Sequence, residues 1–565
     1  MNSPTVLSPK SHNIALEGGS DPASSASKGE CLVDSETQTV TVAWCATSSG
    51  NKAIPLRVEC ALGRGFSGMV MIGSAGQVCE DGKERARAAL ERLGWIAPAR
   101  KILISISPGD AKIDSSHLDL ALCVGLVGVS GAPAWFIQTE EWLFAAEVGL
   151  NGELRPIAGV VSWATVALKA GLKGIVVANE NILELNCLSS VHEEIATSGG
   201  ANFQFVGFQT VADVISWLES GNRPAVHQPA MEPIDSGYID FDDMDLSPEL
   251  ELLAMVAASG MHSILLRGSP GTGKSMLAKR LPSILPKMGI HDHFEALRVH
   301  SSTQRQVSQS IINGVPPFRA PHHFTSLAAM VGTAVSPGEI SLASGGVLFL
   351  DELPEFRRDV LEGLREPLDS GEVAVSRAGA STTWVAKVLL VAAANNCPCG
   401  WSASKRRRCE CPPSRIQAYR NRLSGPLQDR IDLHFNMEEP TNQLTSIFGS
   451  PFEKKGQTSR MRKLVMRARQ RAKSRAELTQ VELNRDISSS LVLSTFGQNT
   501  AQILKTIEAI IPQHASARSL VRCLRVARTI ADIRDREDVL AEDIERAWGW
   551  QAWSAARLRG EILPI

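Results

Sequence analysis

The residues with the clearest chemistry lie at 268–275 and read GSPGTGKS. An apolar run precedes them and a helical pattern, 276–285, follows, which is the strand–turn–helix order of a phosphate-binding loop. Glycines let backbone N–H groups converge on phosphate oxygens, and the helix N-terminus adds its positive end. We expect Lys274 to reach the β- and γ-phosphates of a nucleotide and the Ser275 hydroxyl to hold Mg²⁺. The predicted cofactor-binding residues are Gly268, Ser269, Pro270, Gly271, Thr272, Gly273, Lys274 and Ser275.

Two carboxylates follow a second apolar run. Residues 346–350 read GVLFL and lead into Asp351 and Glu352, as in a buried parallel strand that delivers acids to its carboxyl end. We expect Asp351 to complete the Mg²⁺ site and Glu352 to orient or deprotonate the attacking water. A third apolar strand, 388–394, ends at Asn395, which is placed to contact the γ-phosphate or the water. The pattern predicts an ATPase that uses ATP and Mg²⁺.

The segment RLSGPLQDRIDLHF contains an arginine that could stabilise the negative charge of the transition state of ATP hydrolysis. Arg430 lies just before a strand, and a chain that already holds Lys274 can give this arginine to the γ-phosphate of a neighbouring subunit. The alternative, equally open from the sequence, is a surface arginine paired with Asp429 or Asp432. The first interpretation requires copies of the chain that share their sites.

Four cysteines form a second cluster: Cys397 and Cys399, then nine residues, then Cys409 and Cys411. Thiols so close together can surround one Zn²⁺. The enclosed span would then display consecutive cations beside an aromatic residue, which suits a nucleic-acid backbone. Four reduced structural cysteines, or a redox pair, are the alternatives, but unligated thiols in so basic a loop would be reactive. We therefore predict a structural zinc.

The length, charge and composition of the whole chain limit the classes of protein to which these sites can belong. Its 565 residues predict about three domains. The net charge of −2 gives no global sign of nucleic acid, so any basic surface must be local. With no long apolar run, no signal-peptide core and most cysteines scattered among apolar residues, we expect a cytoplasmic protein that enters no membrane. Residues 1–30, rich in Ser, Gly and Pro, are expected to form a disordered tail.

Between residues 31 and 218, strand and helix signals alternate. We expect strands at 37–46, 53–62, 101–107 and 174–178, helices at 81–93, 118–129, 163–170 and 211–218, and a hairpin at 147–157. The helix at 118–129 is nearly all apolar and should be buried on most sides. The stretch 219–247 is rich in proline and acidic residues, which indicates a linker.

This region resembles the Lon-protease-like domain, of the ribosomal S5 domain 2-like type, through AEVGLNGELRPIAGV and GIVVANENILEL. In proteolytic members a serine nucleophile follows a Gly-Pro pair, and a lysine base lies just after the hairpin. Here Ser115 and Ser116 lack the Gly-Pro pair, and 160–163 contains no lysine. We interpret the domain as a non-proteolytic scaffold in which the two serines cap a helix.

From about residue 55 nearly the whole chain resembles the magnesium-chelatase-like AAA+ ATPases, most densely at 262–436, and specifically their Lon-domain-bearing branch, the ComM (competence protein) type. The resemblance rests on RGSPGTGKSMLAKRLPSILP, PFRAPHHFTSLAAMVG, GEISLASGGVLFLDELPEFRRDVLEGLREPL, VAAANNCPCG and LSGPLQDRIDLH. It implies that Asn395 is the sensor-1 residue and that Arg518 is the sensor-2 arginine of a helical lid. It also implies a helix-2 insertion at 318–337 and a hairpin at 372–384 that face the pore of a homohexameric ring.

The predicted architecture is an α/β fold: an AAA+ P-loop core at 248–440, an α-helical lid at 441–565, and the α+β Lon-like domain in front. The resemblance implies a motor on branched, single- or double-stranded DNA, a branch-migration helicase or translocase in natural transformation and recombination. The ATPase subunit of a magnesium chelatase is the alternative, and an ATP-dependent protease is disfavoured. For the neighbouring His322 and His323, packing or capping is favoured over a pore contact or a metal pair. Trp548, Trp550 and Trp553 are expected to pack the last helix.

Overall fold

The computed structural model describes residues 40–49, 52–72, 76–109, 113, 116–131, 135, 137–192, 203–223, 238–377, 380–402, 404, 406–439, 456–497, 500–512 and 515–551. The predicted tail lies outside these residues, as do Ser115, Trp553 and 224–237 of the predicted linker. Among the described helices, none has both the length and the apolar character needed to cross a membrane.

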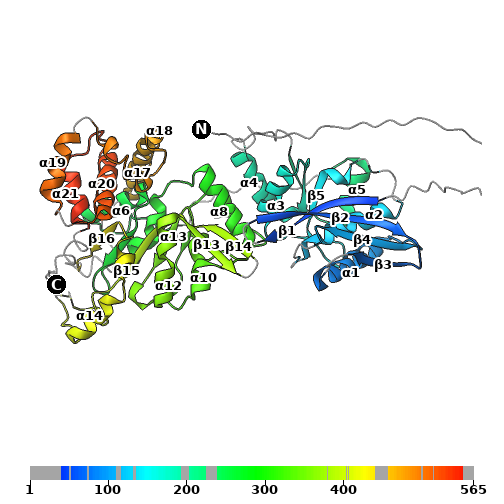
Figure 1. Cartoon of the computed structure of the whole chain (residues 1–565), viewed down its shortest axis with the longest axis horizontal. Coiled ribbons are helices and arrows are strands. Elements are labelled where there is room, and N and C mark those ends of the chain that lie inside the picture. Colours follow the sequence, from blue (N-terminus) through cyan, green and yellow to red (C-terminus); the bar gives the residue numbers. More distant parts are fainter. Residues whose placement is uncertain are drawn as a thin grey trace, which may run out of the picture. The chain divides into compact units, whose positions relative to one another are not determined.

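A seven-stranded mixed sheet organises the N-terminal part of the described chain (Figure 1). Its spatial order is β3 (Gly68–Ile72), β4 (Lys101–Ser107), β2 (Lys52–Gly63), β1 (Val40–Ser49), β5 (Trp142–Ala145), β8 (Gly174–Ala178) and β9 (Gln204–Phe208). Successive side chains alternate between two cores, so that Phe144 and Val176 pack on one face and Leu143 and Val177 on the other. The first face is covered by α1 (Gln77–Arg92), α2 (Asp119–Val129) and α5 (Val211–Ser220), the second by α3 (Val160–Lys169) and α4 (Ile182–His192).

Most of the expected elements of this region are confirmed. The strands at 101–107 and 174–178 coincide with β4 and β8, α2 is buried, and β6 (Glu147–Val148) pairs with β7 (Leu154–Arg155) as the hairpin. The sequence analysis missed β3, β5, α4 and β9. The capping prediction for Ser116 is wrong: its hydroxyl donates to Glu147 Oε2 at 2.8 Å, and no side chain caps α2.

The second sheet has five strands, all parallel, in the order β11 (Phe318–Arg319), β12 (Val347–Leu350), β15 (Leu389–Ala394), β10 (Ile264–Arg267) and β16 (Leu433–Asn436). The three central strands are fully buried, in agreement with their apolar sequences. Because they run parallel, their carboxyl ends meet at one edge, where Gly268, Asp351 and Asn395 follow directly. Ligands of open α/β sheets bind at this edge.

Helices lie on both faces of the parallel sheet. One core joins Ile264 and Val391 to α6 (Pro248–Gly260) and α7 (Lys274–Arg280), and the other joins Leu265 and Leu348 to α12 (Arg358–Gly363). The remaining helices of this part are α8 (Ile290–Thr303), α9 (Gln309–Ile312), α10 (Leu327–Val331), α11 (Glu339–Leu342), α13 (Arg365–Ser370), α14 (Pro413–Asn421) and α15 (Gly425–Gln428).

The last part of the chain is helical, with α17 (Gln457–Ser474), α18 (Ala476–Thr479), α19 (Thr500–Ile510), α20 (Ala517–Ile533) and α21 (Ala541–Gly549). The periodic helix α20 buries its apolar side in the core that also contains α6, and Trp550 is buried there as expected. Many cations of α17 are paired internally: Arg467 and Arg471 contact Asp535, and Arg469 donates to the carbonyl oxygen of Ala258. These arginines are therefore packing and ion-pair groups of the helical part.

Candidate active site

The loop between β10 and α7 has the backbone shape of a phosphate-binding loop. Gly271 and Gly273 have φ angles of +80° and +91°, a region that favours glycine, and α7 begins directly after Gly273. Lys274 is buried, and its Nζ donates to the carbonyl oxygens of Gly268 and Ser269 at 2.8 and 2.9 Å. The loop therefore holds the ammonium group of the lysine that was predicted to contact phosphates.

Burial also changes the ionisation of this lysine. Desolvation lowers the pKa of Lys274 to about 8, and the negative charge of Asp351 partly opposes the shift. A phosphate would oppose it further, because a nearby anion stabilises the protonated amine. The site thus contains a cation whose charge depends on the anions around it.

The predicted magnesium ligands are brought together. Ser275 Oγ donates to Asp351 Oδ2 at 2.7 Å, although 76 residues separate the two. The other carboxylate oxygen of Asp351 accepts from the backbone N–H of Glu352 at 2.9 Å, which fixes the orientation of the group. Both side chains offer oxygen ligands, the kind that Mg²⁺ prefers. The pair therefore fits the metal predicted from the sequence.

Glu352 has an unusual backbone. Its φ of +51° and ψ of +45° lie in the left-handed region, which costs a residue other than glycine about 1–2 kcal/mol. Strained residues of this kind concentrate at functional sites, where the surrounding structure holds them. The strain turns the chain directly after β12, at the sheet edge where Asp351 meets Ser275.

His323, for which the sequence analysis favoured packing or capping, makes a contact with Glu352 that the sequence analysis did not foresee. Its Nδ1 lies 3.6 Å from Glu352 Oε2, although His323 belongs to the predicted insertion. Strand pairing places the two segments near each other: β11 runs parallel to β12 with Phe318 beside Val347, so the chains that lead to His323 and to Glu352 leave the sheet at the same edge. Only the pairing of β11 with β12 could have revealed this, because the residues are distant in the sequence.

The predicted sensor Asn395 lies at the same sheet edge. It follows β15, whose Ala394 pairs with Arg267 and whose Ala392 pairs with Leu350. The asparagine is half-buried between the loop that carries Lys274 and the strand that carries Asp351. Its position agrees with the predicted contact to a phosphate or a water, while its role stays a prediction.

The two predicted arginines form a separate group. Arg430 donates to the carbonyl oxygens of Arg365 and Pro426 at 2.8 and 2.6 Å, and its guanidinium lies 2.5 Å from Asp369 Oδ2. Arg518, at the start of α20, lies 3.8 Å from the same carboxylate oxygen. The partner of Arg430 is thus Asp369, and not the Asp429 or Asp432 considered from the sequence. In the described part of the chain, no hydrogen bond or ion pair joins these arginines to residues 268–275.

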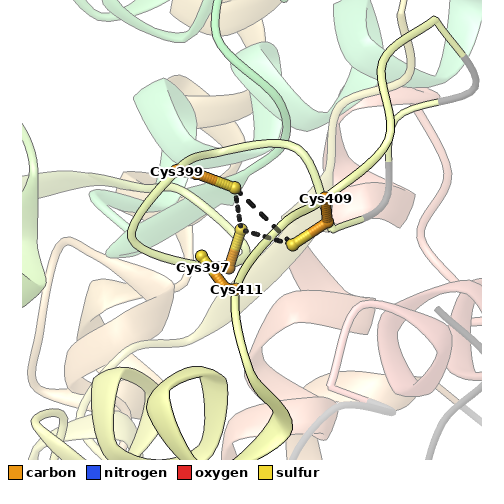
Figure 2. A group of neighbouring side chains, drawn as sticks. All are labelled: Cys397, Cys399, Cys409 and Cys411. Atoms are coloured by element: carbon orange, nitrogen blue, oxygen red, sulfur yellow. Dashed lines mark hydrogen bonds between the residues drawn. The ribbon is translucent and has the colours of Figure 1, made fainter.

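The four cysteines of the loop after β15 converge, as Figure 2 shows. The ligand atoms of Cys397, Cys399, Cys409 and Cys411 all lie within 4.8 Å of one another. Cys397 is buried and the others are half-buried. The backbone amide of Trp401 holds the pKa of the Cys399 thiol below its usual range, because a hydrogen-bond donor stabilises the thiolate.

The predicted hairpin and the predicted insertion touch each other. The hairpin consists of β13 (Glu372–Arg377) and β14 (Ala380–Val385). From β14, Trp384 Nε1 donates to the Thr333 carbonyl oxygen at 2.8 Å, and Thr382 Oγ1 to that of Ala334 at 2.9 Å. At the other end of the insertion, the Phe324 side chain is exposed beside His323. One segment therefore connects the hairpin to Glu352.

Comparison with known proteins identifies the group to which this arrangement belongs. Residues 240–445 match the family model for magnesium chelatase subunit ChlI, residues 58–181 a second ChlI model, and residues 455–551 the ChlI C-terminal model. The protein YifB of Salmonella typhimurium is 34% identical over 89% of this chain and 95% of its own length. Competence protein ComM of Haemophilus influenzae is 31% identical over 90% of this chain and 97% of its own length. The chain belongs to the magnesium-chelatase-like family that includes ComM and YifB.

Membership of the magnesium-chelatase-like family indicates an AAA+ ATPase, in agreement with the geometry of the phosphate-binding loop and the parallel sheet. The family match also covers the residues that carry the site: 240–445 includes Lys274, Asp351, Asn395 and the four cysteines. The shared sequence thus extends over both clusters identified above.

The contact between His323 and Glu352 gives a test of the site. Replacing His323 by Ala should lower kcat for ATP hydrolysis, by up to about 10²-fold, because Glu352, the predicted general base, would lose the side chain that positions it. KM for ATP should change little, because His323 contacts Glu352 and not the phosphate-binding loop. Steady-state kinetics separates the two effects, and His323→Asn, which keeps a polar side chain, should recover part of kcat.

His322→Ala is the matched control, because His322 is an exposed neighbour whose ring packs on His323. It should leave both constants nearly unchanged. Equal losses in the two alanine variants would show that His323 acts only through packing.

Proposed function

We propose that this chain is an ATP-hydrolysing AAA+ motor that acts on DNA as a homohexamer, a branch-migration helicase or translocase in natural transformation and recombination. The observation that carries the hydrolytic part is the contact of Ser275 with Asp351 beside Lys274 and the strained Glu352. The DNA part is supported by similarity to competence protein ComM along nearly the whole chain, and by the cationic loop described below.

Each residue of the site has a distinct task in this proposal. Lys274 binds the β- and γ-phosphates, Ser275 and Asp351 hold Mg²⁺, and Glu352 accepts a proton from the attacking water. Asn395 orients that water or the γ-phosphate. The bound Mg²⁺ would supply positive charge that neutralises the phosphates. Arg430 and Arg518 would leave their shared carboxylate, Asp369, for the phosphates of a nucleotide at a subunit boundary.

In this proposal DNA contacts two exposed features of the part of the chain that holds the ATP site: the cysteine loop and Phe324. Arg406, Arg407 and Arg408 are exposed in the cysteine loop, and the Arg407 guanidinium lies 5.5 Å from the centre of the Trp401 ring. Cations beside an aromatic ring suit a phosphate backbone and stacked bases. The exposed Phe324 offers a second apolar surface to a strand in the pore.

The N-terminal part serves, in this proposal, as a Lon-like domain without proteolytic activity. The Ser116 hydroxyl is bound to a carboxylate, and the start of α3, Val-Val-Ser-Trp, offers no lysine to activate a nucleophile. The C-terminal helices serve as the lid, which carries Arg518 toward the shared site.

The experiment is ATP hydrolysis by the purified full chain with and without forked DNA, together with retention on that DNA across a range of salt concentrations. We expect DNA to stimulate hydrolysis. The double change Arg407→Ala, Arg408→Ala should weaken binding to all sequences alike and reduce the slope of log K against log salt by about 2. The control is Arg87→Ala, an exposed arginine of α1 paired with Glu91.

Hydrolysis that no form of DNA stimulates, with no retention on branched DNA at low salt, would overturn the DNA part. The ATPase subunit of a magnesium chelatase is the second candidate, since the family models carry that description. Capture of a porphyrin-binding subunit, with hydrolysis that responds to it, would favour that candidate.

A further inference from the structure

The loop that carries the four cysteines is built against the phosphate-binding loop. Gly400, one residue after Cys399, has a φ of +86°, and a Cβ at this position would lie 2.6 Å from Pro270 Cγ and 2.7 Å from Pro270 Cδ. Only glycine fits at position 400, because the backbone there is left-handed and because the Pro270 ring fills the space that a side chain would need. The two loops are therefore in direct contact.

The sulfur atoms have the spacing of a tetrahedral thiolate site. The Sγ–Sγ distances are 3.3 Å for Cys397–Cys399, 3.7 Å for Cys397–Cys409 and 3.5 Å for Cys399–Cys409. Four thiolates at about 2.3 Å from one Zn²⁺ lie about 3.8 Å apart at tetrahedral angles. Sulfurs joined in a disulfide would be about 2.05 Å apart. The backbone N–H of Ser402 donates to Cys397 Sγ at 3.3 Å, as a donor does beside a metal-bound thiolate.

Further contacts connect this loop to the nucleotide site. Asn395 lies only two residues before Cys397. Arg406 lies 3.8 Å from Glu439, in the segment whose Met437 donates its N–H to the Arg267 carbonyl oxygen at 2.7 Å. Met437 also lies beside Gly268, the first glycine of the phosphate-binding loop. The cysteine loop thus touches the phosphate-binding loop and the strand ends on either side of it.

We propose that Cys397, Cys399, Cys409 and Cys411 bind one Zn²⁺, and that this ion holds Gly400 against Pro270 and thereby sets the nucleotide affinity of the phosphate-binding loop. The effect on nucleotide affinity rests on the proposed function, because it requires that the phosphate-binding loop binds nucleotide. The zinc site itself is independent of that function. Without the ion, no bond to a metal joins the two cysteine pairs that flank the nine residues 400–408, which are mostly polar and basic. Gly400, the first of these residues, then loses its fixed position.

The test measures zinc and nucleotide affinity separately on the full chain. Metal analysis of the purified protein should find one zinc per chain. Removal with a zinc-selective chelator should weaken binding of a fluorescent ATP analogue about tenfold or more, and added Zn²⁺ should restore it. Absence of zinc, with four freely titrating thiols, would overturn the metal site. Zinc removal that leaves the affinity unchanged would overturn the coupling.

Gly400→Ala tests the contact without touching a thiol. This variant should keep its zinc and still bind the analogue about tenfold more weakly, because alanine is strained at this left-handed backbone and its methyl group meets the Pro270 ring. Adding Pro270→Ala removes the two ring carbons that clash and should recover part of the affinity. Unchanged affinity in Gly400→Ala would overturn the coupling. A wild-type chain that holds zinc but binds no nucleotide would instead contradict the proposed function and leave the metal site standing.

Discussion

Replacing Arg430 by Ala should lower ATP hydrolysis by about 10³- to 10⁵-fold, because an arginine donated to the γ-phosphate supplies that much of the rate. Mixing this variant with Lys274→Ala should restore activity. In a mixed assembly, some sites combine an intact phosphate-binding loop from one subunit with an intact Arg430 from the next. Steady-state hydrolysis at a series of mixing ratios measures the recovery.

The mixing experiment also distinguishes an Arg430 that acts in a neighbouring subunit's ATP site from an Arg430 that only supports the fold of its own chain. Within its own chain Arg430 binds Asp369 and two carbonyl oxygens, so its loss could also disturb the fold locally. A structural defect would remain in every Arg430→Ala subunit, and mixing would not rescue it. Arg422→Ala is the control, because Arg422 is a more exposed arginine of the same segment that pairs with Glu355. No recovery at any ratio would exclude the assignment of Arg430 to a neighbour's site.

Glu352→Gln should lower hydrolysis by about 10²- to 10⁴-fold, the usual contribution of a general base. ATP binding should persist, because Lys274, Ser275 and Asp351 are untouched. Single-turnover hydrolysis and equilibrium binding of a fluorescent analogue measure the two effects. The control is Glu355→Gln, a partly exposed carboxylate that lies three residues further on and pairs with Arg422.

The left-handed backbone of Glu352 gives this experiment a second readout. Asn tolerates that conformation better than Glu, so Glu352→Asn should be inactive and yet unfold at a higher temperature than Glu352→Gln. The expected gain is about 1 kcal/mol. A lower unfolding temperature for the Asn variant would show that Glu352 is not strained in solution.

Much of the site could be predicted because its parts are local patterns. The phosphate-binding loop, the strand before Asp351 and the strand before Asn395 are each a short apolar run followed by polar residues, and parallel pairing brings their ends together. The cysteine cluster was visible for the same reason, since its four members lie within one short segment.

The contacts that were missed depend on strand order and on side-chain packing. His323 reaches Glu352 only because β11 lies beside β12, and Gly400 meets Pro270 only because β15 lies beside β10. Arg430 pairs with Asp369 on α13, and Asp369 belongs to no motif that would have marked it in the sequence. Short buried elements such as β5, with four residues, were missed because a short apolar run fits a helix as well as a strand.

Two contacts of the insertion that begins with β11 bear on how chemical energy could become mechanical work. His323 lies beside Glu352, the predicted general base, while the carbonyl oxygens of Thr333 and Ala334 accept hydrogen bonds from β14. Thr333 therefore lies only ten positions after His323, so one short stretch of chain contacts both Glu352 and the hairpin. In the proposed motor, a movement at this sheet edge would reach the hairpin through this short segment, as well as through α12 and α13, which join β12 to β13 along the chain.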